Sequence, residues 1–189
     1  MSKGNSEKQH KNTGWVVAIF FITILISGTI SLISEELIGS SGLAVAFIIL
    51  LLIVFIGIIF DVIGVAVTSA DESPFHAMAA RKVRGAKEAI RLLRKADRVS
   101  SICNDVVGDI CGVVSGSAAA TISVQLVSRF GFSWPTVISL AMSAIVAGLT
   151  VGGKAVGKNL AISASTRIVH RVGIVLYYFG RIFAGKNKE

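Results

Sequence analysis

The chain has 189 residues, of which 53% are hydrophobic and only 16% are charged, and its mean hydropathy is +0.75. These values exclude a disordered chain, a disulfide scaffold and an ordinary soluble enzyme, in which about 25% of residues are charged. The net charge of +8 and the pI of about 9.9 fit basic residues held on the cytoplasmic side of a bilayer better than a nucleic-acid-binding surface. We therefore expect a membrane protein that is not an enzyme and has no nucleic-acid partner.

Four stretches are long and apolar enough to cross a bilayer, for which a helix needs about 20 residues. In chain order they are residues 14–33, 43–70, 99–127 and 134–153. The first follows a short basic tail, residues 1–13, and resembles a signal peptide in that respect. However, its apolar run is longer than the roughly 7–15 residues of a signal-peptide core, and Ser34-Glu35-Glu36 offers no small-residue cleavage site. A retained anchor is therefore the favoured interpretation over a cleaved segment.

The distribution of Lys and Arg sets the expected orientation. With the N-terminus inside and four crossings, three basic residues lie in the N-terminal tail, eight in residues 71–98 and seven from Lys154 onward. These 18 of the 19 basic residues are then cytoplasmic, and only Arg129 is outside. Cytoplasmic loops of membrane proteins carry this kind of excess of Lys and Arg. We predict a multi-pass protein of the plasma membrane or the bacterial inner membrane, with both termini in the cytoplasm.

The loop between the second and third spans, residues 71–98, has the pattern of a basic pair of juxtamembrane helices. Acidic residues followed by Pro74 are typical of a helix start, and Gly85 is expected to divide the stretch into two helices. Two interpretations stay open: a surface that lies on anionic lipid headgroups, or an ordinary cytoplasmic loop packed on its own spans. The basic residues concerned are Arg81, Lys82, Arg84, Lys87, Arg91, Arg94, Lys95 and Arg98.

The C-terminal stretch, residues 158–183, mixes apolar side chains with Arg167 and Arg171, which would be costly near the middle of a fifth span. We therefore expect a helix that lies along the membrane interface like a belt, followed by a short tail, residues 184–189. Together with the four spans and the juxtamembrane pair, this helix completes a predicted all-α fold.

Ionisable residues inside spans cost about 2.5–3.5 kcal/mol each and are often functional. Asp61 lies toward the end of the second span. Asp105 and Asp109, four residues apart, share one face of the third span. Carboxylate and amide oxygens are the ligands that Mg²⁺ prefers, so the candidate cation-binding residues are Asp61, Asn104, Asp105 and Asp109, the first three as metal ligands. A polar cavity for a cation or proton is one interpretation, and an internal ion pair, in which Lys154 reaches an aspartate, is the other.

Residues 43–183 resemble the transmembrane domain of the cyclin M / CorC family of magnesium transporters. The stretch Ala86–Arg98 is similar to the family pattern A-x-x-A-L-x-L-L-x-x-P-D-R, with Ala96 in place of the proline. Cys103-Asn104-Asp105 stands where the family has Gly-Asn-Asn, so the resemblance implies a cation-ligand role for Asn104. The family motif G-E-x-x-P-K, which ends the last span before a belt helix, is similar to Gly153–Lys158.

The chain departs from that family at several positions. Lys154 replaces the glutamate that binds the cation in the last motif, and Asp61–Gly64 is a reduced form of the small-residue and glutamate motif of the family's first span. The span at 14–33 is additional, and we expect the family's cytoplasmic regulatory domains to be missing.

The resemblance implies a homodimer in the lipid bilayer, with Mg²⁺ as the bound or transported ion. Two functions stay open. The first is transport or binding of a divalent cation through the aspartates and Asn104. The second is a non-transporting membrane partner or regulatory subunit, with an unidentified membrane or cytoplasmic partner, in which Lys154 replaces the bound cation.

Overall fold

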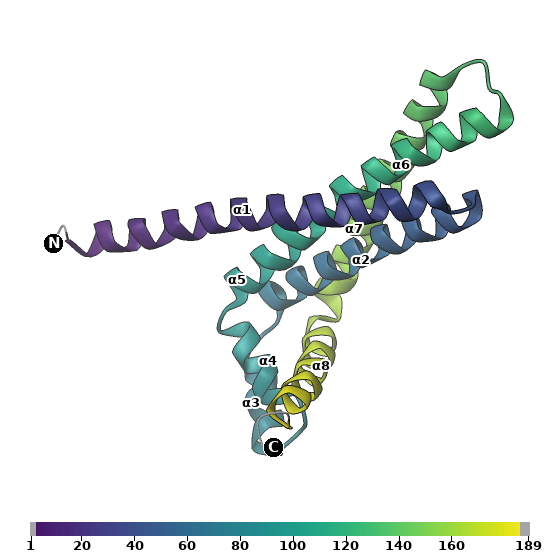
Figure 1. Ribbon diagram of the computed structural model, residues 1–189. Coiled ribbons are helices and arrows are strands. Elements are labelled where there is room, and N and C mark those ends of the chain that lie inside the picture. Colours follow the sequence, from purple (N-terminus) through teal and green to yellow (C-terminus); the bar gives the residue numbers. More distant parts are fainter. Residues whose placement is uncertain (1–2, 186–189) are drawn as a thin grey trace. The chain divides into compact units, whose positions relative to one another are not determined.

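The computed structural model describes the backbone of residues 3–185 and the side chains of residue 17 and residues 19–182. This part of the chain is helical and contains no strand, which confirms the predicted all-α class (Figure 1). Its helices are α1 (Lys3–Ser40), α2 (Leu43–Ser69), α3 (Ser73–Ala80), α4 (Ala86–Leu93), α5 (Ala96–Ser101), the π-helix η1 (Ile102–Gly108), α6 (Asp109–Phe130), α7 (Pro135–Ser163) and α8 (Ser165–Gly185).

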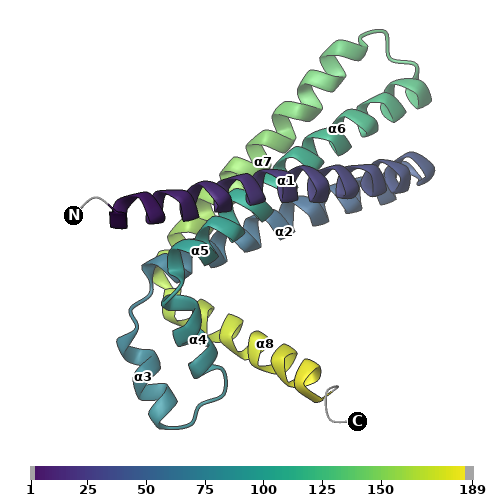
Figure 2. The same cartoon turned by 60° about the vertical axis from the view of Figure 1, so that its left-hand side comes forward.

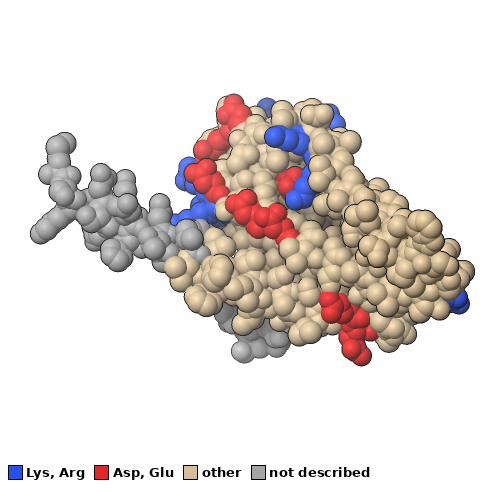
Figure 3. Space-filling view, turned by 90° about the horizontal axis from the view of Figure 1, so that it is seen from above, with Lys and Arg blue, Asp and Glu red and all other residues tan. Residues whose placement is uncertain are grey.

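Four helical stretches are long and apolar enough to cross a membrane, as predicted. They are Ile19–Ser40, Leu43–Ser69, Ala96–Phe130 and Pro135–Ser163. Many large apolar side chains on them are exposed to the surroundings, as lipid contact requires. Figure 3 shows the same property on one face of the molecule, where most of the surface is uncharged and acidic and basic side chains gather in patches.

The first span ends later than expected. The sequence pattern predicts its end at Ile33, whereas α1 continues through Ser34-Glu35-Glu36 to Ser40. The hydroxyl of Ser40 donates to the carbonyl of Glu36 at 2.7 Å, which satisfies one of the carbonyls left open at a helix end. At the other end, α1 begins at Lys3, so most of the expected N-terminal tail belongs to the helix. Most of the expected C-terminal tail, residues 186–189, lies outside the described residues.

The chain divides into two compact units, of which the first contains residues 1–54 and 110–147. Within this unit α1 contacts α6 through polar as well as apolar groups. The Gln125 side chain donates to the carbonyl of Ile38 at 2.7 Å, and the Ser117 hydroxyl donates to the carboxylate of Glu35. Ile38 itself is fully buried. These bonds give polar groups of two apolar helices defined partners.

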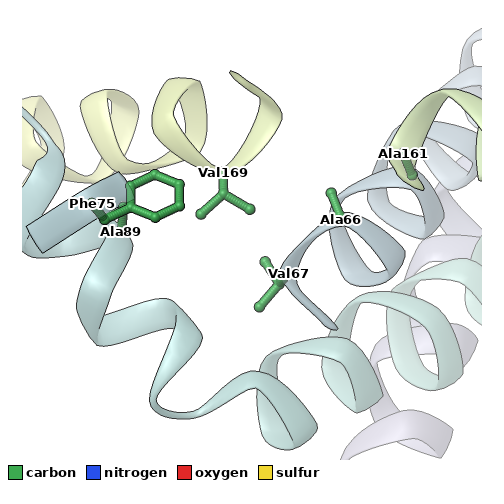
Figure 4. Close-up of a cluster of buried hydrophobic side chains, with 6 residues drawn as sticks. All are labelled: Ala66, Val67, Phe75, Ala89, Ala161 and Val169. Atoms are coloured by element: carbon green, nitrogen blue, oxygen red, sulfur yellow. The ribbon is translucent and has the colours of Figure 1, made fainter. Parts of the chain in front are cut away.

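The second unit contains residues 55–109 and 148–189 and includes the basic pair α3 and α4 together with α8. Its apolar core contains one or two buried side chains from each of five helices (Figure 4). The only aromatic ring among the six buried members is that of Phe75, which is fully buried. The core residues are Ala66 and Val67 of α2, Phe75 of α3, Ala89 of α4, Ala161 of α7 and Val169 of α8.

Residues 71–98 contain the helices α3 and α4, with Gly85 between them, and the first residues of α5. Pro74 is the second residue of α3, where a missing N–H costs nothing, and Gly85 precedes α4 with φ of +81°. Only glycine adopts that conformation freely. The helix α4 packs against α8, and the two lie next to each other in Figure 1, while Figure 2 shows that α8 extends beyond α4 at an angle.

The last helix boundary differs from the predicted start of a belt helix at Lys158. The helix α7 continues to Ser163, and α8 begins at Ser165 after a turn at Ala164. The physical reason is packing, because a side chain at Gly157 would collide with Val62 of α2. This close approach of α7 to α2 keeps the stretch around Gly157 in the same helix as the span.

We expect the four-span orientation to be visible by labelling. In a chain whose native cysteines are replaced, a membrane-impermeant maleimide should label Ser40→Cys on intact cells and Lys87→Cys only after permeabilisation. Both native side chains are exposed, so access is limited by the membrane and not by burial. The reverse pattern would contradict the predicted orientation.

Candidate polar site in the membrane helices

The central feature of the second unit is an ion pair between two spanning helices. Lys154 Nζ, on α7, lies 3.6 Å from Asp61 Oδ1, on α2. The two side chains are largely buried, with 25% and 16% of their surfaces exposed. Asp61 is therefore the aspartate that Lys154 reaches, which the sequence alone left undecided among three.

A glycine of η1 completes the surroundings of this pair. A Cβ atom built on Gly108 would lie 3.4 Å from Lys154 Nζ and 4.0 Å from Asp61 Oδ1. Because Gly108 has no side chain, the third helix can approach the ammonium and the carboxylate closely. The backbone of η1 at Gly108 therefore lies directly against the pair.

Asn104 lies beside the same helix α2, one turn along from Asp61. Its amide occupies the space over Gly64, where any side chain would collide with Asn104 Oδ1. The Nδ2 group donates to Ser100 Oγ at 3.3 Å, but the shielded Oδ1 has no hydrogen-bond partner among the described residues. An unsatisfied buried acceptor costs about 1–3 kcal/mol. Asn104 Oδ1 would therefore gain from accepting a hydrogen bond or from coordinating a cation.

The backbone that carries Asn104 is irregular. Residues Ile102–Gly108 form a π-helix between α5 and α6, where the sequence pattern predicts a regular span. Such segments are rare in helices and are frequent at functional sites. No signal in the sequence marks the change of helix type, because polar and glycine residues such as Asn104 and Gly108 also occur in regular spans.

The remaining two candidate ligands lie outside this arrangement. Asp105 accepts a hydrogen bond from Ser101 Oγ at 2.7 Å, and neither Asp105 nor Asp109 forms an ion pair with another described residue. Both carboxylates are exposed. Among the residues whose side chains are described, no group of three His, Cys, Asp or Glu could hold a metal ion. The structure thus brings together Asp61 and Lys154, with Asn104 near them, and does not bring in Asp105 or Asp109.

The eight basic residues of the juxtamembrane pair are all exposed. Arg94 forms an ion pair with Glu72 at 3.1 Å, and Arg84 donates to the hydroxyl of Tyr178 at 3.5 Å. The helix α4 keeps its charges on one side, because Ala86 and Ala89 are its buried residues. Basic groups of this loop therefore point away from the core of the unit.

Comparison with known proteins assigns no family to the chain. No protein-family model, no curated protein and no solved structure matches it. The similarity to the cyclin M / CorC family therefore stays a prediction that depends on the motifs in the sequence.

Proposed function

We propose that this protein is a multi-pass membrane protein in which the ammonium group of Lys154 takes the place of a bound divalent cation. It would then act as a non-transporting partner or regulatory subunit in the membrane rather than as a magnesium transporter. The observation that supports this proposal is the 3.6 Å contact between Lys154 Nζ and Asp61 Oδ1.

Electrostatics favour this assignment over a divalent site. Mg²⁺ requires near-ideal octahedral coordination by oxygen and is usually bound through one or two carboxylates. Here the positive charge of Lys154 already neutralises Asp61, and like charges a few ångströms apart repel strongly away from bulk water. A divalent ion could bind Asp61 only if Lys154 first moved away.

The motif resemblance supports the same conclusion. In the cyclin M / CorC family, the position that matches Lys154 is a glutamate that binds the cation, so the substitution reverses the charge of a ligand. Localisation in the plasma or bacterial inner membrane with cytoplasmic termini belongs to the proposal because of the distribution of Lys and Arg. A homodimer belongs to it because of the family resemblance.

One observation favours the alternative function, transport or binding of a cation. Asn104 Oδ1 is shielded and has no hydrogen-bond partner among the described residues, so it could bind a metal ion together with Asp61 once Lys154 has turned away. In that case Lys154 would act as a competitor of the ion and not as its permanent replacement.

Calorimetric titration of the purified protein with magnesium tests the proposal. We expect no saturable binding to the native chain at millimolar magnesium, and saturable binding to the Lys154→Glu variant, because the substitution replaces a repelling charge by an oxygen ligand. Lys158→Glu is the matched control: it makes the same change of charge four residues on in α7, at an exposed position, and should not create a site.

Saturable magnesium binding by the native chain would contradict the proposal and support the alternative. If Lys154→Glu and Lys158→Glu increase the affinity for magnesium equally, overall charge controls binding and the pair with Asp61 does not. Either result is readable without a transport assay.

A further inference from the structure

The loop between α3 and α4 borders a second feature, a cavity of about 470 Å³ that we call the loop cavity. It lies within the second unit, and neither Asp61 nor Lys154 lines it. Its charged and polar lining consists of Lys82, Arg84, Lys87, Glu88 and Tyr177, and small apolar side chains and Gly85 complete the wall.

The loop cavity carries a surplus of positive charge. Three cations and one carboxylate line it. The ammonium groups of Lys82 and Lys87 form no hydrogen bond or ion pair with a described residue, and the described hydrogen-bond partner of the Arg84 side chain is the neutral hydroxyl of Tyr178. The surplus is therefore available for an anionic ligand.

Backbone groups at the same place also favour an anion. The first intrahelical bond of α4 runs from the Ala89 N–H to the Gly85 carbonyl at 2.9 Å. The N–H groups of Lys87 and Glu88, which precede it, have no acceptor among the described residues. Open N–H groups at the positive end of a helix attract phosphate and carboxylate.

The loop is held in place by α8 and not by its own contacts alone. A side chain at Gly85 would meet the backbone of Ile174 at 2.5 Å, and one at Gly173 would collide with the Gly85 carbonyl. His170 Nε2 donates to the Arg84 carbonyl at 3.2 Å. Lys82 keeps a φ of +57°, which is unfavourable for lysine and persists only when the surroundings fix it. A cationic site fixed before binding loses less entropy when a ligand arrives.

The surroundings of the loop cavity have the composition that is common at a membrane surface. Val83 on the loop is 38% exposed, and on α8 Tyr178 and Phe179 are 46% and 57% exposed. Exposed apolar and aromatic side chains next to basic ones are typical of helices at headgroup level.

We infer that the loop cavity binds the phosphate of an anionic lipid headgroup, and that its preferred ligand is a phosphomonoester such as phosphatidic acid. A phosphomonoester carries between one and two negative charges near neutral pH, which matches the surplus of the lining. This inference does not depend on the role of Lys154, so either can fail alone.

Native mass spectrometry of the full chain in detergent tests the inference, with phosphatidic acid, phosphatidylcholine and inorganic phosphate as separate probes. We expect phosphatidic acid to bind more tightly than phosphatidylcholine. The variant Lys82→Gln/Lys87→Gln should weaken binding of phosphatidic acid by about tenfold to thirtyfold, since each basic residue near a lipid surface contributes a factor of about five.

The matched control is Arg91→Gln/Lys95→Gln, which removes the same charge from exposed positions that do not line the loop cavity. It should change the affinity for phosphatidic acid by less than about twofold. Lys82→Arg/Lys87→Arg should retain binding, which separates loss of charge from loss of folding.

Equal weakening by the two glutamine variants would overturn the inference, because it would show a diffuse surface effect. Tight binding of inorganic phosphate without a preference for phosphatidic acid would overturn the assignment to a lipid. Retained binding in Lys82→Gln/Lys87→Gln would exclude the loop cavity.

Discussion

Replacing Phe75 by alanine is expected to lower the free energy of unfolding of the second unit by about 3–5 kcal/mol. The ring is fully buried and is the largest side chain of a core otherwise built from alanine and valine (Figure 4). The core residues beside the ring, Ala89 and Val169, are too small to fill the space that it would leave, so a cavity would remain.

A thiol-reactive dye provides the measurement, because Cys103 belongs to the same unit and is buried. We expect Cys103 to become reactive at a clearly lower temperature in Phe75→Ala than in the native chain, with Cys111 replaced in both. Phe179→Ala is the control, since that ring is 57% exposed. If Cys103 becomes reactive at the same temperature in Phe75→Ala and Phe179→Ala, burial of Phe75 does not stabilise the unit.

Replacing Gly173 by valine should separate α4 from α8, at a cost of about 2–3 kcal/mol. The atoms that a side chain would meet there include the Gly85 carbonyl and the backbone nitrogen of Ala89, at 3.1 Å from the first added carbon. Backbone atoms cannot turn aside as the end of a flexible side chain can, so the helices must move apart.

Gly180→Val on the same helix is the matched control, because a side chain at Gly180 has nothing within 4 Å. We expect a lower melting temperature for Gly173→Val and little change for Gly180→Val in the same dye assay. Gly173→Val should also weaken phosphatidic acid binding while Lys82 and Lys87 are still present. Unchanged stability of Gly173→Val would show that α4 and α8 are not held together by this contact.

The number of spans and the helical pair could be predicted from the sequence because both depend on local properties. Length and hydropathy define a spanning segment without reference to its neighbours. Similarly, Pro74 and Gly85 determine backbone geometry at their own positions, and the structure has a helix start at the first and a break at the second.

Features that depend on contacts between helices could not be predicted in the same way. The sequence places Lys154 near three aspartates without choosing one, and the choice of Asp61 results from the packing of α7 against α2. Gly157 indicates a possible break in the sequence, yet it lies within α7, where its missing side chain makes room for Val62 on the neighbouring helix.

The candidate site was predicted in part. Asp61 and Lys154 were expected in a cation site or an ion pair, and the pair is what the structure shows. Asp105 and Asp109 were expected to share a helix face, which helical periodicity justifies, but periodicity does not tell whether that face meets another polar group. The unsatisfied amide of Asn104 could not be predicted either, because the sequence does not show that this side chain packs over Gly64.

The π-helix Ile102–Gly108 has a consequence for how this chain is compared with others. A π turn closes its hydrogen bond one residue later than an α turn, so it behaves as a one-residue insertion in a helix. Deleting a single residue inside it would return the segment to α-helical geometry and change how Asn104 is placed relative to Gly108. An alignment with a relative that is α-helical throughout would need a one-residue gap there. The π-helix would therefore be gained or lost by insertion or deletion of one residue rather than by substitution.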